Sequence, residues 1–368
     1  MRVVVLGLGV SGIAAAQFLI KQNHEVIGID KKPIESINCI REENCPKQFD
    51  LLVVSPGIAP SNPVYQYAIA QGIEVIGEIE LALRHMKQRA IGVTGTNGKT
   101  TTVMRIAHTL NINGQNAIAC GNIGVPLISL LDESENTIFV VELSSFQLET
   151  ISSKKFDSSL LLNVTPDHLE RYDSFDHYKK VKEKLAQFTK KGRSIQYVEN
   201  IDGALKILAL YGIGESAFWQ AEKSFKMAKH RIELIKEIDE ILFYNDSKGT
   251  NVDSTLYASS KIDRPIILLA GGKDKNLSFK PWKKGFKNSV KLIIAFGETK
   301  EKIKSDVSPE FDVIIKDDLK SAFHEAMKRV KKKEAILLSP GCSSFDQFDN
   351  YIQRGEAFCQ YVKEYYEP

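Results

Sequence analysis

Cysteine is scarce in this sequence, and no long apolar run is present. The five cysteines are odd in number and form no C-x-x-C pair, which argues against a disulfide framework and against a zinc knuckle. No run approaches the roughly 18 apolar residues of a membrane span, and glycines interrupt the apolar N-terminal stretch. We therefore expect a cytoplasmic protein in a reducing compartment, without membrane insertion.

A strong net charge is also absent. The formal charge is +3, although lysines are dense in KKGFKNSVK and KRVKKK. A weakly positive total supplies little of the field that nucleic-acid binding needs, so solvated lysine faces are the favoured interpretation and no nucleic-acid partner is expected. A multiply anionic small substrate is compatible with this charge.

The length predicts more than one domain. At about 150 residues per domain, 368 residues make two or three. Short β-branched runs alternate with helical patterns, which predicts right-handed crossovers and parallel sheets. We predict an α/β protein of three domains in series: a Rossmann-like domain (1–88), a central P-loop ATPase-like parallel sheet (89–228) and a Rossmann-like C-terminal domain (229–368). RIELIKE and EILFYND are expected to form a hairpin, and a helix is expected over about 175–188.

The N-terminal stretch resembles a dinucleotide fingerprint. An apolar run ends in GLGVSG, a helical pattern follows, and a second apolar run ends at Asp30. Glycines permit a tight turn and close phosphate approach, and an acid about 20 residues on suits a ribose hydroxyl. This pattern alone favours an NAD-dependent dehydrogenase. However, a unit that ends near residue 88 is short for a full dinucleotide domain.

The strongest motif is GVTGTNGKTT at residues 92–101. A strand, a glycine-rich loop and a helix starting with Lys99 and Thr100 are typical of a phosphate-binding loop, in which amides and the lysine hold phosphates and the threonine holds Mg²⁺. The strict G-x-x-x-x-G-K-T spacing is not met, because Val93 stands five positions before Gly98. An ordinary βα turn is the weaker alternative.

Polar side chains follow two further strands. Glu142 ends the strand in TIFVVEL, and Asp167 and His168 follow SLLLNVT. The carboxyl ends of parallel strands share one edge, where ligands bind, and a phosphate-bound Mg²⁺ suits a carboxylate. Considered alone, Glu142 could equally be an ordinary acid at a strand end. His168 considered alone is more typical of a surface histidine.

The C-terminal third carries NDSKGTN, GGKDK and SPGCSSFDQF at strand ends or turns. Ser344 and Gln347 fit an S-x-x-Q capping box, whose structural role is one alternative. A capped helix also offers amides to a carboxylate. Lys248 and Lys275 near such a helix end would suit an acidic substrate.

Eight segments in order resemble the Mur ligases of peptidoglycan synthesis, and the resemblance runs from Val3 to about Gly355. NDSKGTN and SPGCSSFDQF point to the D-glutamate-adding branch, whereas the wider family includes folylpolyglutamate synthetases. The segments are GVTGTNGKTT, GNIGVP, VVELSSFQLE, NVTPDHLERY, HRIE, NDSKGTN, GGKDK and LLSPGCSSFDQFDNYIQRG.

The resemblance implies an ATP-dependent ligase that joins UDP-N-acetylmuramoyl-L-alanine to D-glutamate through an acyl phosphate, using Mg²⁺. It implies a monomer whose domains close around their substrates. It also implies five groups of site residues. The ATP-binding group is Gly95, Thr96, Asn97, Gly98, Lys99, Thr100, Thr101, Arg231 and Asp246. The UDP-substrate group is Val10, Ser11, Asp30, Ser55, Gly57 and Asn122. The D-glutamate group is Lys248, Thr250, Ser344, Phe345 and Tyr351. The metal group is Thr100, Glu142, His168 and a carbamylated Lys182, and the catalytic residues are Lys99, Asn122, His168 and Lys182.

The chain departs from the family pattern at several places. Four lysines within six residues leave the register of the carbamylated lysine open, and a solvated helix face is the alternative. The central domain is short, and the missing part falls between Lys182 and His230. There, Glu199 and Gly203 replace the histidine and last asparagine of a His-Asn-x-x-Asn segment, so ATP binding by other residues is an alternative. Tyr351 stands where the pattern usually has phenylalanine.

Three other functions are weighed against the D-glutamate ligase: a Mur-type ligase for another amino acid, an NAD-dependent dehydrogenase, and a catalytically silent binding protein. An activity assay with a panel of amino acids distinguishes the first of these from the D-glutamate ligase. The loop at 92–101, which a simple dehydrogenase does not need, argues against the second. Retention of Lys99, Glu142, His168 and Lys182 argues against the third.

Overall fold

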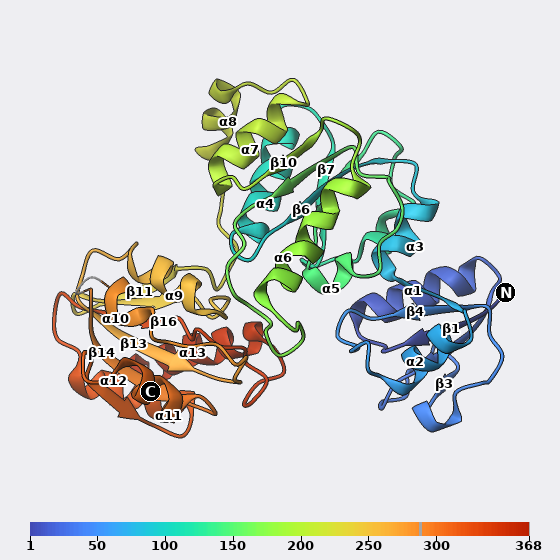
Figure 1. Ribbon diagram of the computed structural model, residues 1–368. Helices are drawn as coiled ribbons and strands as arrows, with labels where there is room; N and C mark the ends of the chain where they lie inside the picture. Colours follow the sequence, from blue (N-terminus) through green and yellow to red (C-terminus); the bar gives the residue numbers. More distant parts are fainter. Residues whose placement is uncertain (287–288, 368) are drawn as a thin grey trace. The chain divides into compact units, whose positions relative to one another are not determined.

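The structure is a computed structural model that describes residues 1–286 and 289–367 (Figure 1). It contains three sheets of five, five and six strands. By their contacts the residues form two compact units. The first comprises Met1–Val164 and Asp176–Phe225, and the second comprises Thr165–Phe175 and the chain from Lys226 onward.

The first sheet is parallel, with the order β3-β2-β1-β4-β5. Its strands are β1 (Arg2–Leu6), β2 (Glu25–Ile29), β3 (Cys39–Ile40), β4 (Leu51–Val54) and β5 (Glu74–Gly77), and its helices are α1 (Val10–Lys21), η1 (Glu42–Asn44), α2 (Pro63–Ala70) and α3 (Glu78–His85). Apart from the exposed end residues of β1, β2 and β5 and the partly exposed β3, the strand residues are almost all buried, as expected of strands whose two faces are covered. The order 3-2-1-4-5 is that of a Rossmann sheet one strand short.

The second sheet is also parallel, with the order β10-β9-β6-β8-β7. Its strands are β6 (Arg89–Thr94), β7 (Ala117–Gly121), β8 (Ile138–Glu142), β9 (Ser158–Leu161) and β10 (Ser194–Gln196). Its helices are α4 (Lys99–Ile112), η2 (Leu127–Leu130), α5 (Ser145–Leu148), α6 (Phe175–Glu183), η3 (Lys184–Phe188), α7 (Asn200–Ala209) and α8 (Glu215–Glu222). One core cluster joins α4, α7 and α8 to β6, β8 and β9, so β6 and its following loop have a rigid support.

The third sheet belongs to the second unit and has the order β11-β12-β16-β13-β14-β15. Its strands are β11 (Glu233–Ile238), β12 (Ile241–Asn245), β13 (Ile266–Gly271), β14 (Val290–Phe296), β15 (Val313–Ile315) and β16 (Ala335–Leu338). Its helices are α9 (Val252–Ser259), α10 (Trp282–Gly285), α11 (Lys300–Val307), α12 (Leu319–Arg329) and α13 (Tyr351–Tyr366). Core residues divide into two clusters that alternate along its strands, so both faces of the sheet are covered.

Most elements predicted from the sequence are confirmed. β11 and β12 form the expected antiparallel hairpin, and the other pairings of this sheet are parallel. The helix expected over 175–188 is α6 followed by the 3₁₀ turn η3. The boundaries at 88 and 228 stay predictions.

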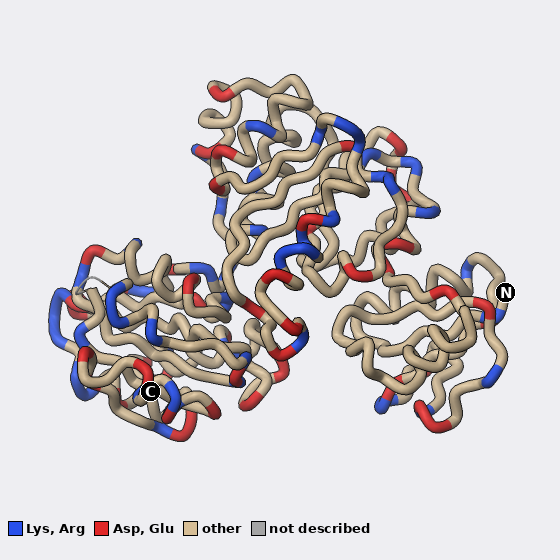
Figure 2. The backbone as a smooth tube through the Cα atoms, in the orientation of Figure 1, with Lys and Arg blue, Asp and Glu red and all other residues tan. Residues whose placement is uncertain are grey.

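Lys and Arg residues lie among Asp and Glu residues in both units (Figure 2), and lysines of the two lysine-dense stretches pair with acids from other segments. Lys283 pairs with Glu310 at 2.8 Å, and Lys332 pairs with Glu240 at 3.6 Å. Both pairs are partly or largely exposed, as in an ordinary solvated surface. Within the described part of the chain, every helix is too short or too polar to cross a bilayer.

Candidate active site

The loop between β6 and α4 has the shape of a phosphate cradle. Gly95 and Gly98 have φ values of 152° and 84°, which favour glycine. A Cβ on Gly95 would lie 2.8 Å from Leu162, and one on Gly98 would lie 2.2 Å from the Asn200 amide. Gly98 caps α4, whose first turn holds no acid, so its positive end is available to an anion.

Lys99 folds back over this loop. Its Nζ donates hydrogen bonds to the carbonyls of Gly95 and Thr96, both at 2.8 Å. The loop therefore holds the ammonium group beside the amides that would face a phosphate. A fixed cation at this place neutralises phosphate charge without a large reorganisation.

Two side chains from separate segments meet at Glu142, at the end of β8. The Thr100 hydroxyl donates to Glu142 Oε2 at 2.7 Å, and the Asn122 amide donates to Oε1 at 2.8 Å. Glu142 is 1% exposed. The structure thus brings together three residues that the sequence places 20 to 42 positions apart.

This group fits a magnesium ion chemically. Among the described residues no cluster of three His, Cys, Asp or Glu side chains forms an all-protein metal cage. Mg²⁺ prefers oxygen and is commonly held by one or two carboxylates together with substrate phosphates and water. A carboxylate and a hydroxyl next to a phosphate loop satisfy that pattern.

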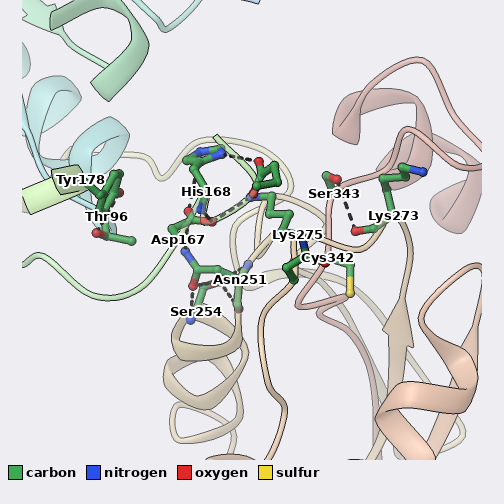
Figure 3. A network of polar contacts seen from close by, with 12 residues as sticks. Thr96, Asp167, His168, Tyr178, Asn251, Ser254, Lys273, Lys275, Cys342 and Ser343 are labelled. Carbon is green, nitrogen blue, oxygen red and sulfur yellow. Dashed lines mark hydrogen bonds and ion pairs between the residues drawn. The ribbon is translucent and has the colours of Figure 1, made fainter. Parts of the chain in front are cut away.

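Helix α6 contacts the same phosphate loop. The Thr96 hydroxyl and the Tyr178 hydroxyl lie 3.1 Å apart (Figure 3), and Lys182 Nζ donates to the Gly95 carbonyl at 2.9 Å. Lys182 is 1% exposed, whereas the neighbouring Lys180 is exposed. The alternative of a solvated helix face is therefore wrong for Lys182. The lysine that the resemblance indicates for carbamylation is the buried one.

The N-terminal end of α7 lies beside the loop as well. Asn200 begins α7 and packs against Gly98, while its Oδ1 is buried without a hydrogen-bond partner among the described residues. Glu199 is exposed and makes no capping bond. Gly203 packs on the sheet, because a Cβ there would lie 2.9 Å from Leu160. Position 203 of this chain thus faces the core.

The three glycines of GLGVSG have different structural roles. Gly7 needs its φ of 85°, and Gly12 has no room for a side chain, since a Cβ would lie 1.9 Å from the Gly7 carbonyl. Ser55 donates to that carbonyl at 2.6 Å and so fixes the turn. A Cβ on Gly9 would meet nothing within 4 Å. Its lack of a side chain leaves the amino end of α1 open to a ligand.

Asp30 supports this turn from the next strand. Its carboxylate accepts hydrogen bonds from the Leu8 amide at 2.6 Å and the Lys32 amide at 3.1 Å. Burial acts to raise the pKa of Asp30, but the backbone hydrogen bonds outweigh it and lower the pKa. Asp30 therefore carries its charge at neutral pH. Val10 is 70% exposed, and Gly57 has open space around its Cα.

In the second unit, Asp167 lies at the centre of a buried polar group (Figure 3). Lys275 Nζ donates to its Oδ1 at 3.1 Å, and the Asn251 amide lies 3.4 Å from its Oδ2. Asn251 also caps α9 through Ser254. From its place in the sequence Lys275 is a candidate for binding an acidic substrate, although the family resemblance does not place it among the D-glutamate residues.

His168 belongs to the same group of segments. Its φ of 56° is unusual for a residue other than glycine, and its Nδ1 lies 3.2 Å from Glu170 Oε1. Glu142 belongs to the first unit and His168 to the second. Their joint role in metal binding stays a prediction.

Asp246 directly follows β12 and is almost fully buried. Ser339 donates to its Oδ2 at 2.7 Å, and the Ile232 amide donates to its Oδ1 at 3.2 Å. Burial raises the pKa of Asp246 to about 7, although Ser339 and the nearby Arg231 act in the opposite direction. This carboxyl group is therefore able to gain or lose a proton near neutral pH.

The residues expected to hold D-glutamate lie on two loops of the second unit and at the start of α13. Lys248 Nζ is 4.0 Å from the centroid of the Tyr351 ring, a cation–π contact, and the His230 ring lies edge-on to the same ring. Phe345 is 71% exposed, while Ser344 is buried. Tyrosine at 351 thus keeps the aromatic face that a phenylalanine would offer.

Sequence reasoning missed Arg354. It is fully buried in α13, and its guanidinium donates four hydrogen bonds of 2.9–3.1 Å to two loops. The acceptors are the hydroxyl and carbonyl of Ser247 and the carbonyls of Cys342 and Ser343. The loops that carry Lys248 and Ser344 are therefore tied to one side chain. The only sequence feature that could have indicated Arg354 is the QRG tripeptide at residues 353–355, which is part of the last segment that resembles the family.

The capping box proposed at Ser344 and Gln347 is wrong. Residues 344–350 form turns and bends, and the next helix, α13, is capped by Asn350. The Gln347 amide instead donates to the Asp317 carbonyl at 2.7 Å. The same S-x-x-Q pattern does form a capping box at Ser144 and Gln147, at the start of α5.

Comparison with known proteins assigns the family. The model of the Mur ligase middle domain matches residues 93–256, and that of the Mur ligase glutamate ligase domain matches residues 230–342. The chain therefore belongs to the Mur ligase family, whose members are ATP-dependent ligases. Within this family the N-terminal residues 1–77 match the MurD-like N-terminal domain.

Full-length relatives agree with this assignment. The UDP-N-acetylmuramoylalanine–D-glutamate ligase of Protochlamydia amoebophila is 38% identical over 435 residues, which cover 98% of each chain. The ligase of the same name from Caldicellulosiruptor bescii is 35% identical over 449 residues, covering 99% of this chain and 97% of the relative. Both alignments are longer than the 368 residues of this chain, so it lacks segments that these relatives have.

Solved structures share the fold. The MurF ligase of Thermotoga maritima in complex with ADP has a TM-score of 0.62 at 15% identity, with 99% of this chain and 95% of that chain covered. The UDP-N-acetylmuramate–alanine ligase of Thermotoga maritima has a TM-score of 0.60 at 17% identity, with coverages of 100% and 99%. At these identities the likeness concerns the fold alone.

Proposed function

We propose that this protein is an ATP-dependent ligase that joins D-glutamate to UDP-N-acetylmuramoyl-L-alanine in peptidoglycan precursor synthesis. The observation that carries the proposal is the full-length similarity to D-glutamate ligases, together with a phosphate loop whose Thr100 and Glu142 are in contact. An oxygen of the L-alanyl carboxylate attacks the γ-phosphorus of ATP, and ADP leaves. The amine of D-glutamate then attacks the acyl carbon, and phosphate leaves as the amide forms.

In the first unit, the loop from Gly95 to Thr101 binds the ATP phosphates. Lys99 Nζ lies over this loop and stabilises the charge on the transferred phosphoryl group. Asn122, held by Glu142, contacts the transferred group or the substrate carboxylate. Arg231 and Asp246 are the proposed nucleotide contacts of the second unit.

Thr100 and Glu142 are the proposed magnesium ligands, joined by His168 and by Lys182 as a carbamate. When bound, Mg²⁺ would neutralise phosphate charge. Carbamylation would join the Lys182 nitrogen to the carbon of CO₂; the ammonium group loses two protons in this reaction, so a buried cation becomes an anion. Burial of Lys182 beside the Gly95 carbonyl supports this choice among the four lysines.

The turn around Gly9 is the proposed handle for the UDP end of the substrate. Val10 and Ser11 open α1, and Asp30, Ser55 and Gly57 follow neighbouring strands of the first sheet. Helix amides bind a pyrophosphate irrespective of the attached group, so the fingerprint that favoured a dehydrogenase serves a uridine nucleotide here.

Five residues of the second unit are proposed to bind D-glutamate: Lys248, Thr250, Ser344, Phe345 and Tyr351. Lys248 supplies a cation for a carboxylate, and the exposed Phe345 ring supplies an apolar wall. Action in the cytoplasm as a monomer completes the proposal.

The test is D-glutamate-dependent phosphate release from ATP, Mg²⁺ and UDP-N-acetylmuramoyl-L-alanine. We expect release with D-glutamate and not with L-alanine or diaminopimelate, and a fall of at least ~100-fold in Lys99→Ala, because a transition-state cation is lost. Lys21→Ala, which removes an exposed lysine of the same unit, is the matched control. Release that depends on another amino acid would reverse the choice of substrate. Saturable NADH binding would favour the dehydrogenase.

A further inference from the structure

Tyr197 has an unusual position at the edge of the central sheet where β6 ends in the phosphate loop. It follows β10, and its amide donates to the Leu161 carbonyl at 2.8 Å. Its φ of 56° is rare for an aromatic residue, and it is 48% exposed. A strained, exposed aromatic residue persists when its surroundings hold it, and such residues are common at ligand sites.

Helix α6 holds the Tyr197 ring from one side. The phenol donates a hydrogen bond to Glu183, and Lys179 Nζ lies 5.3 Å from the ring centroid. Burial, followed by the effect of Glu183, raises the pKa of Tyr197 to about 12, so the phenol stays protonated at neutral pH. Lys179 covers one face of the ring and adds positive charge there.

The same helix contacts the phosphate loop. Tyr178 bonds Thr96 and Lys182 bonds Gly95, so α6 fixes the Tyr197 ring relative to that loop. A second connection runs along the chain. Asn200 is three residues on, a path of at most about 11 Å, and it packs against Gly98 of the loop.

The surroundings of Tyr197 lack the usual partners for a purine base. Glu199 points to solvent and Gly203 packs on the sheet, so neither replaces the family side chains at those positions. Asn200 Oδ1 is buried without a partner among the described residues and packs against Gly98. Aromatic side chains stack on nucleobases through their π-faces.

We propose that the Tyr197 ring is the platform on which the adenine of ATP stacks in this shortened central domain. The inference rests on the proposed function only in taking ATP as the nucleotide. Tyr197 is a base-binding residue, whereas the loop from Gly95 to Thr101 binds the phosphates. Base and phosphate binding are therefore separable.

The test compares the dissociation constants of ATP and inorganic tripolyphosphate for the full chain by calorimetry. Base stacking is worth about 1–3 kcal/mol, and for a half-exposed ring we expect Tyr197→Ala to weaken ATP binding roughly 5- to 20-fold. Tripolyphosphate binding is expected to stay unchanged. Tyr197→Phe keeps the ring and is expected to bind ATP within about twofold of wild type.

Tyr197→Gly separates function from folding. Glycine accepts a φ of 56° without strain, so this variant is expected to melt no lower than wild type and still to lose ATP affinity. Trp219→Ala, which removes a 46%-exposed aromatic residue from α8 of the same unit, is the matched control and should bind ATP normally.

Unchanged ATP affinity in Tyr197→Ala overturns the proposal. So does an equal loss of ATP and tripolyphosphate binding, or an equal loss in Tyr197→Phe, because the phenol contact with Glu183 would then be the cause. A wild-type chain that binds neither ligand overturns the proposed function as well. A chain that binds ATP through Tyr197 but ligates another amino acid overturns only the substrate assignment.

Discussion

Arg354 connects the loops of the second unit that are proposed to bind D-glutamate. Burial lowers the pKa of Arg354 to about 10, so it remains charged at neutral pH. A buried charge is tolerated where its donors are bonded, and here four of the five N–H groups of the guanidinium donate hydrogen bonds. Arg354 is therefore a positioning residue for two loops.

Replacing Arg354 by methionine should both destabilise the chain and weaken D-glutamate binding. The carbonyls of Ser247, Cys342 and Ser343 would lose donors in a buried place, at a cost of about 3 kcal/mol or more. Urea unfolding measures this cost, and a rise in the KM for D-glutamate with an unchanged KM for ATP measures the loop displacement.

Arg329→Met is the control for Arg354, because Arg329 is half-exposed and pairs with Glu325 at 2.7 Å. Its effect should stay below about 1 kcal/mol. An Arg354→Met chain with wild-type stability and wild-type D-glutamate KM would contradict the positioning role.

At the scale of elements, helix α3 connects the first sheet to the segment after the GNIG loop. Glu78 begins α3 and is buried, and its Oε1 accepts from the Ile128 amide of η2 at 2.7 Å. Burial raises the pKa of Glu78 to about 7, against the opposing effect of the amides of Ile128 and Leu127. The contact between α3 and η2 is thus sensitive to pH.

The sign of this dependence follows from proton binding. Glu78 has a higher pKa in the folded than in the unfolded chain, so the folded state binds more protons between about pH 4.5 and 7. The free energy of unfolding therefore falls as pH rises through this range, by up to about 3 kcal/mol from this group. Glu78→Gln removes the contribution.

Urea unfolding at pH 5 and pH 8 checks this expectation. Wild type should lose more stability than Glu78→Gln over the interval, while the similarly raised pKa of Asp246 contributes equally to both. Parallel pH dependences in the two chains would show that Glu78 does not titrate in this way.

At the scale of the whole molecule, the three ligands are proposed to bind to distinct segments. Hydrogen exchange should slow at the amides of residues 7–12 with UDP-N-acetylmuramoyl-L-alanine and at 95–101 with ATP, because ligand phosphates bond these amides. D-glutamate should slow exchange at residues 341–345. NADH should slow exchange in none of these segments. Slower exchange at residues 7–12 with NADH but not with the uridine nucleotide would favour the dehydrogenase hypothesis.

Local sequence patterns predicted helices and strands well where one or both faces of the element are buried. The apolar runs that became β1, β6 and β13 were evident, whereas β3 has only two residues and offers no period to detect. The S-x-x-Q pattern shows the limit of such patterns. At Ser144 it caps a helix, but at Ser344 the Gln347 side chain bonds the distant Asp317 carbonyl instead.

The sequence by itself determined the phosphate loop, the order of the motifs and the family, because these depend on residues close together in the chain. Only the tertiary structure decided which of four lysines is buried against Gly95, 87 positions away, and that Arg354 spans 107 positions to Ser247. It likewise gave Tyr197 its strained place beside the loop. Such contacts form when separate elements pack, and no local spacing specifies them.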